Sequence, residues 1–197
     1  RARVAELDRA TAARIRTVRR RPDATFFTRR GAADNVFKLY VLRGGQETLL
    51  GDPEDWQKET GKPHAINYFE PSPDSRLVAV GVSPGGNELA SLYVYDTATR
   101  QRVEGPIDRA RYSGPQWLAD SKSFFYSRGP VVQEGAPVSE NFRNRGAYHH
   151  VVGTDPAKDA YLAGPDGNPR IPVLPTQSPN VVYTPGSRYA VAIVFDG

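Results

Sequence analysis

One pattern recurs four times along this 197-residue chain. Each copy has an apolar or aromatic residue, a short polar turn, and then a run of strand-forming residues. The copies are VRRRPDATFFTRR (18–30), FEPSPDSRLVAVGVS (69–83), PQWLADSKSFFYSRG (115–129) and VVYTPGSRYAVAIVF (181–195). When the turn residues Asp23, Asp74, Asp120 and Gly186 are aligned, they lie 51, 46 and 66 positions apart. Repeats at such periods are typical of supersecondary units that stack in a row or around an axis, and they restrict the fold to such arrangements.

A second strand-forming stretch follows each of the first three copies, at 36–46, 90–101 and 147–159. These stretches are short, rich in Val, Tyr and Leu, and bounded by Gly, Pro, Asn or Asp, which is typical of strands joined by turns. The last spacing is the longest because a stretch with several Gly and Pro residues, 129–146, is inserted there. Only residues 1–14 combine helix-forming residues with no Gly or Pro, so we expect one short N-terminal helix.

Four-stranded units of about 40–50 residues are the signature of β-propeller blades. We therefore predict an all-β fold, an incomplete β-propeller over residues 15–197. It should hold about three four-stranded blades plus the start of a fourth. The expected blade ranges are about 15–52, 66–104 and 112–164, with the fourth blade starting over about 178–197.

An incomplete ring has two consequences. Its first and last sheets each leave an edge unpaired, so we expect self-association through these edges or pairing with further sequence. The blades also need apolar filling between them, and Trp117 and the FFY run at 124–126 are expected to supply it.

The charge of the chain is unevenly distributed. Residues 1–30 hold ten arginines against three acidic residues, a balance of +7, whereas the whole chain carries +4. A basic segment can bind nucleic acid, but no aromatic residues for base stacking alternate with the arginines around VRRRP (18–22). We therefore expect a solvated basic strand and turn, with no nucleic-acid partner. A steep salt dependence of DNA or RNA binding would support the alternative.

Composition excludes several classes of protein. The chain has no cysteine, which rules out disulfides, thiol nucleophiles and cysteine-ligated zinc. No apolar stretch approaches the roughly 20 residues that span a membrane, so no membrane partner is expected. With 39% hydrophobic and 24% charged residues, the chain suits a soluble protein, and a periplasmic and a cytoplasmic location fit it equally well.

GVSPGG (81–86) contains the Gly-x-Ser-x-Gly pattern that marks the nucleophile of many serine hydrolases. That nucleophile needs a strand, a sharp turn and a helix, and the residue after the serine donates its backbone N–H to the oxyanion. Here Pro84 follows Ser83 and has no N–H to donate, and the next regular element is another strand. We interpret Ser83 as a turn residue and predict no catalytic residue in the chain.

The remaining polar candidates do not assemble a catalytic or metal site. His149 and His150 are neighbours in a strand, so their side chains point to opposite faces and cannot bind one metal. His64 lies in an expected loop with no carboxylate and serine nearby. The acidic residues of GDPEDW (51–56) lack the ligand spacing of a calcium loop and are expected to be solvated. We predict no metal and no cofactor.

Residues 68–128 resemble the propeller of the prolyl oligopeptidase family of serine peptidases. Its pattern there is roughly FSPDG-x-x-hAYGhSxxGs, a strand with D-x-x-T-G, and KFSGhxWxxDxxxFFY. YHHVVGTDPAKDAYL (148–162) is similar to the family's YxHxLGTxxxxDxLV segment, and residues 34–54 are similar to its first blade. The chain departs from the pattern where serine stands in place of the usual turn glycine, at Ser75, Ser121 and Ser187.

The resemblance implies a two-domain serine endopeptidase that cleaves short proline-containing peptides after proline. An α/β-hydrolase domain carries the Ser-Asp-His triad in that family, and a seven-bladed propeller covers it and restricts entry to short peptides. The family's triad follows the propeller, so this chain is expected to gate and select substrate without catalytic residues. It would partner the hydrolase domain of the same protein, and the helix at 1–14 would be the segment that enters from that domain.

Tyr112, in ARYSG, matches the aromatic residue of the family's KFSG motif, which faces the domain interface near the substrate pocket. The resemblance therefore implies a substrate-binding role for Tyr112, with a rim aromatic that merely packs as the alternative. Two other functions remain open for the whole chain. One is a stand-alone propeller that serves as a protein-interaction scaffold. The other is the propeller of a related dipeptidyl or acylaminoacyl peptidase.

Overall fold

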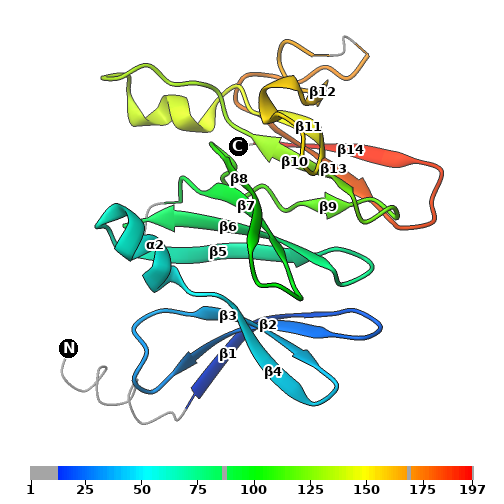
Figure 1. Cartoon of the computed structure of the whole chain (residues 1–197). Coiled ribbons are helices and arrows are strands. Elements are labelled where there is room, and N and C mark those ends of the chain that lie inside the picture. The colour runs from blue at the N-terminus through cyan, green and yellow to red at the C-terminus, as the bar shows by residue number, and fades with distance from the viewer. Residues whose placement is uncertain (1–12, 86–87, 168–169, 197) are drawn as a thin grey trace.

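The computed structural model describes residues 13–85, 88–167 and 170–196, and their regular structure is almost entirely antiparallel sheet. Figure 1 shows four sheets that follow one another in chain order, each beside the next. In every sheet, strands that are consecutive in sequence are also neighbours in space. This meander topology is that of propeller blades, and we number the sheets as blades 1 to 4. The prediction of an all-β fold is confirmed.

Blades 1 and 2 each have four strands. Blade 1 consists of β1 (Ala13–Arg20), β2 (Thr25–Gly31), β3 (Lys38–Arg43) and β4 (Gln46–Gly51). Blade 2 consists of β5 (His64–Pro71), β6 (Leu77–Pro84), β7 (Ser91–Asp96) and β8 (Arg102–Ile107).

Blade 3 repeats the plan, and blade 4 is represented by one hairpin. Blade 3 consists of β9 (Gln116–Trp117), β10 (Ser123–Arg128), β11 (Gly146–Val151) and β12 (Ala160–Ala163). Blade 4 consists of β13 (Ser178–Tyr183) and β14 (Ala190–Phe195). Two short 3₁₀ helices, η1 (Val138–Phe142) and η2 (Pro156–Lys158), lie in the connections within blade 3.

The four sheets span residues 13–51, 64–107, 116–163 and 178–195, and β1 begins within the range 1–14 that we expected to be helical. Residues 1–12 lie outside the described residues, and Ala13 and Arg14 belong to β1 rather than to a helix. Within the described ranges, no helix is long and apolar enough to cross a membrane.

A helix that we did not predict, α2 (Pro53–Thr60), joins blades 1 and 2 at the GDPEDW segment. Asp52 caps it by accepting a hydrogen bond of 3.0 Å from the Glu54 N–H, and proline occupies the first helical turn. Gly61 ends it in the left-handed conformation, with φ of 73°. The segment is therefore a capped helix rather than a loop, while its acidic residues Glu54 and Asp55 are exposed, as expected.

The core fills the spaces between neighbouring blades. One cluster joins Phe26 and Leu39 of blade 1 to Val78 and Val80 of blade 2, and a second joins blade 2 to blade 3. As expected, Trp117 and two of the three FFY residues are buried in the second cluster. The Trp117 and Phe124 rings lie 5.0 Å apart, centroid to centroid. Burying a side chain of this size stabilises the fold by roughly 1.5–3 kcal/mol, so blade contacts dominate its stability.

Candidate functional site

Tyr112 lies in the loop between β8 and β9, at the end of the blades where the β6–β7, β8–β9, β10–β11 and β12–β13 connections lie (Figure 1). We call this the loop end. The side chain of Tyr112 is 57% exposed, and its backbone is in the left-handed region with φ of 48°. Such a conformation is unfavourable for an aromatic residue and persists only when neighbours hold it.

Hydrogen bonds to blades 2 and 3 hold the loop on both sides of Tyr112. The Ala110 N–H donates to the Ala90 carbonyl at 2.9 Å, and the Ser127 N–H donates to Ser113 Oγ at 3.2 Å. The Tyr68 hydroxyl of β5 also donates to the Ala110 carbonyl, at 2.6 Å. The loop is therefore fixed, and the exposed Tyr112 ring stands on a rigid base.

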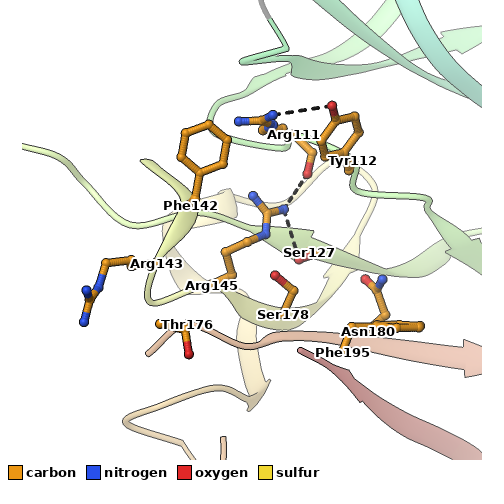
Figure 2. Close-up of a pocket in the computed structure, with 10 residues that line it drawn as sticks. All are labelled: Arg111, Tyr112, Ser127, Phe142, Arg143, Arg145, Thr176, Ser178, Asn180 and Phe195. Carbon is orange, nitrogen blue, oxygen red and sulfur yellow. Dashed lines mark hydrogen bonds between the residues drawn. The ribbon is translucent and has the colours of Figure 1, made fainter. Parts of the chain in front are cut away.

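Arg111 is nearly buried beside Tyr112, and three groups surround its guanidinium. It forms an ion pair with Glu88, and the rings of Tyr112 and Phe142 lie 4.6 and 4.0 Å from it, measured to the ring centroids. Cation–π contacts of this kind favour Arg because its planar group stacks on an aromatic face. Figure 2 shows Phe142 and Tyr112 on the two sides of Arg111.

Arg145, immediately before β11, lies below Arg111 and is only 6% exposed. Its Nη2 group donates to the Arg111 carbonyl oxygen and to Ser127 Oγ, the latter at 3.2 Å (Figure 2). Burial, together with the positive charge of Arg111, lowers the pKa of the Arg145 guanidinium. An arginine still stays protonated at physiological pH, so a positive charge is buried here.

These side chains border a cavity of about 480 Å³ between blades 3 and 4. The lining combines arginines, aromatic rings and small polar groups: Arg111, Arg143 and Arg145, then Tyr112, Phe142 and Phe195, then Ser127, Thr176, Ser178 and Asn180. Figure 2 shows the aromatic and small polar side chains around Arg145. No acidic residue lines the cavity among the residues that the structure describes. The site is thus suited to bind a ligand with an apolar and an anionic part.

Ser83 is not the turn residue that we predicted. It is buried within β6, where it pairs with Ala65 of β5, and the turn begins only at Gly85. The element after the turn is the strand β7, as expected, so the strand–turn–helix of a nucleophile elbow is absent from this part of the chain.

Gly81 of the same motif has a packing role instead. A Cβ atom at Gly81 would lie 2.1 Å from the Tyr68 ring, so the tyrosine can cover the strand only because residue 81 has no side chain. Tyr68 in turn holds the carbonyl of Ala110 in the Tyr112 loop. Gly81 therefore helps to position the Tyr112 loop indirectly, because it leaves room for the Tyr68 ring.

His150 lies in the core between two carboxylates. His150 is completely buried, with Nδ1 2.8 Å from Asp159 Oδ1 and Nε2 3.1 Å from Glu104 Oε1. Burial alone would lower the pKa of His150, but the two carboxylates outweigh it and raise that pKa to about 9. The carboxylates bind opposite sides of one ring, and no group of His, Asp and Glu residues that could hold a metal occurs among the described residues.

The other two histidines stand apart from this cluster. His149 lies beside the Phe125 ring, with a centroid separation of 5.4 Å. His64 is the first residue of β5 rather than a loop residue, and its Nδ1 lies 2.7 Å from the Lys62 carbonyl oxygen.

Comparison with known proteins agrees with this architecture. Residues 7–176 match the family model described as the N-terminal β-propeller domain of prolyl oligopeptidase. The prolyl endopeptidase of Elizabethkingia meningoseptica is 31% identical over 148 residues, which cover 74% of this chain and 20% of that protein. Prolyl oligopeptidase ophP of Omphalotus olearius is 30% identical over 184 residues, or 83% of this chain and 24% of that protein.

Solved structures show the same fold. A structure from a study of two prolyl endopeptidases, concerned with inter-domain dynamics in catalysis and specificity, superposes with a TM-score of 0.78 at 25% identity. The match covers 98% of this chain and 28% of that one. Prolyl oligopeptidase B of Galerina marginata, bound to a 35mer hydrolysis and macrocyclization substrate, gives a TM-score of 0.75 at 19% identity, with 98% and 29% coverage.

The matches confirm the predicted incomplete propeller and the resemblance seen in residues 68–128. This chain spans about a fifth to a quarter of the length of the curated relatives. The chain belongs to the prolyl oligopeptidase family and forms part of that family's N-terminal β-propeller domain.

Proposed function

We propose that the full-length protein is a serine endopeptidase that cleaves short peptides after proline, and that this propeller segment gates and selects its substrates. The proposal rests on family membership and on the exposed Tyr112 ring, which lies at the cavity of the loop end. The curated relatives are named as prolyl endopeptidases and prolyl oligopeptidases.

Tyr112 is suited to contact a peptide for a physical reason. Its loop is held by blades 2 and 3, so the ring loses little conformational freedom when a ligand binds against it. An aromatic face offers apolar area to a proline ring or to another apolar residue of the peptide. We assign Tyr112 as a substrate-binding residue on the propeller side, and the reaction itself to residues of the hydrolase domain.

The loop end also has the features of a surface that another domain covers. Exposed apolar side chains gather in its loops, from the β6–β7 connection to the insert before β11: Leu89, Val131, Val138 and Phe142. A group of exposed apolar residues of this kind typically marks an interaction surface. We propose that the hydrolase domain of the same protein packs here, so that peptides reach its active site past Tyr112.

The test uses the full-length protein and a set of internally quenched peptides, each with one proline. We expect cleavage after proline in peptides with blocked ends, and loss of cleavage as the same sequence is embedded in a folded protein of increasing size. Cleavage that requires a free N-terminus, or an N-acetylated terminal residue, would identify the related exopeptidases instead. Absence of any proline-directed hydrolysis would overturn the proposal and favour a binding scaffold.

A further inference from the structure

Arg145 differs from the other shielded arginines in having no acidic partner. Arg21 pairs with Glu70, Arg102 with Glu59, Arg111 with Glu88 and Arg128 with Asp108. Arg145 is the most buried of this group, yet none of the described residues offers it a carboxylate. Its hydrogen bonds go to a neutral carbonyl oxygen and a neutral hydroxyl.

A buried guanidinium without an anion is unfavourable, because burial removes the hydration of its charge and nothing replaces it. Here the neighbouring Arg111 adds a second positive charge, and both effects lower the pKa of Arg145. Glu88 pairs with Arg111 and not with Arg145. The surroundings of Arg145 therefore lack one negative charge.

The geometry leaves a place for that charge. Nη2 donates both of the hydrogen bonds that Arg145 forms with the described residues, which leaves Nε and Nη1 for a ligand. The side chain lines the 480 Å³ cavity and also a smaller pocket of about 230 Å³ beside Gly129. Ser178 and Asn180 of β13 line the same cavity and can add hydrogen bonds (Figure 2). The rings of Tyr112 and Phe195 supply apolar walls for the rest of a ligand.

We propose that this cavity binds a carboxylate of the peptide substrate, with Arg145 as its direct partner. A carboxylate suits one guanidinium, since its two oxygens accept two N–H donors side by side. The choice of a peptide as the carrier of the carboxylate rests on the proposed function. The protein then selects peptides that place Asp, Glu or a free C-terminus at a set distance from the residue in contact with Tyr112.

The first test needs no mutation. Blocked, C-terminally amidated octapeptides with one proline are compared in pairs that carry Glu or Gln at one position at a time. We expect one position at which Glu raises kcat/KM about tenfold over Gln, the usual scale of a charge-assisted hydrogen bond. Matched peptides with a free C-terminal carboxylate show whether the chain end, rather than a side chain, is the preferred anion.

Variants then assign the effect to Arg145. In Arg145→Gln the ratio between the Glu and Gln peptides should fall to about one, whereas Arg145→Lys should keep part of it because the charge remains. Arg76→Gln is the matched control, since the Arg76 side chain is exposed between β5 and β6 and does not line the cavity. The control should keep the full preference.

A binding experiment separates this proposal from the proposed function. A fluorescent acidic peptide without proline is titrated by anisotropy into the full-length protein, beside its Gln counterpart. Binding that requires Glu and Arg145, without hydrolysis of any proline peptide, would uphold the carboxylate site and overturn the peptidase proposal. Hydrolysis after proline with equal kcat/KM for every Glu and Gln pair would overturn the carboxylate site alone.

Discussion

The hydroxyl of Ser75 in blade 2 donates a 2.5 Å hydrogen bond to Asp23 Oδ1 in blade 1. Blade 3 repeats the contact in another form, because the Asp74 N–H donates to Ser121 Oγ at 3.1 Å. Ser75 and Ser121 are both buried and both have positive φ, of 63° and 56°. These are two of the positions where the family pattern has a turn glycine. At both positions the serine holds a left-handed backbone conformation that glycine would adopt more easily, and its hydroxyl forms a hydrogen bond that joins consecutive blades.

Substitution of Ser75 separates the two effects. Ser75→Gly loses the hydroxyl but relieves the left-handed backbone, so we expect a loss of at most about 1 kcal/mol in the free energy of unfolding. Ser75→Ala loses the hydroxyl and keeps the strain, and should lose about 1–2 kcal/mol. Urea denaturation of the two variants gives the comparison. If Ser75→Ala is the more stable of the two, the left-handed backbone at residue 75 carries no strain, and if it is as stable as the wild type, the bond to Asp23 contributes nothing.

The buried His150 makes stability depend on pH. Its folded pKa of about 9 lies above its ordinary value of 6.5. The stabilisation by Asp159 and Glu104 is therefore complete below about pH 6.5 and is lost as pH rises through about 9. The difference between the two pKa values corresponds to roughly 3 kcal/mol. Thermal unfolding between pH 6 and 9.5 should show Tm falling in the wild type and much less so in His150→Gln. His64→Gln is the control, and it should follow the wild type.

Tyr112 should affect substrate binding more than chemistry. In the full-length protein, Tyr112→Ala should raise KM for blocked proline peptides about three- to tenfold and leave kcat within about twofold, because the ring contacts the peptide away from the reacting atoms. Tyr112→Phe should keep most of the wild-type KM. Tyr189→Ala removes a still more exposed tyrosine, in the turn between β13 and β14 at the opposite end of the blades, and should change neither constant. Unchanged KM and kcat in Tyr112→Ala would show that Tyr112 does not bind the substrate.

For the Gly-x-Ser-x-Gly pattern, we predict that substitution of Gly81 lowers stability and weakens substrate binding, whereas substitution of Ser83 leaves catalysis unchanged. Gly81→Ala forces the Tyr68 ring away and should destabilise the fold by about 1–3 kcal/mol, the usual effect of overpacking. It should also raise KM, because Tyr68 supports the Tyr112 loop. Ser83→Ala should leave kcat of the full-length protein unchanged in a standard peptidase assay. A loss beyond about tenfold in kcat would reopen the case for a catalytic Ser83.

The exposed side of β14 should cause the 197-residue chain to associate with itself. Within the described residues, β14 is hydrogen-bonded to β13 alone, and its Val191 and Ile193 side chains are exposed. An unpaired strand edge with apolar side chains readily pairs with another chain. Light scattering should show a mass that rises with concentration, and Val191→Lys should restore the monomer. A strictly monomeric wild type at high concentration would contradict this expectation.

Local patterns in the sequence were sufficient for much of the fold. Strand positions and turns could be predicted because alternating apolar residues and turn residues act over a few positions. The helix α2 could also have been found, since Asp52, Pro53 and Gly61 are ordinary cap signals. The expected turn at Ser83 was wrong because strand ends depend on cross-strand pairing, here with Ala65.

The candidate site could be predicted only at Tyr112, through its resemblance to a family motif. Nothing near Arg145 in the sequence indicates its burial beside Arg111, which lies 34 positions earlier. Nor does the sequence indicate that His150 meets Glu104, 46 positions away, in the neighbouring blade. The repeats by themselves determined which segments become strands and blades. The packing of one blade against the next decided which charges meet, because those contacts form only when distant segments are stacked.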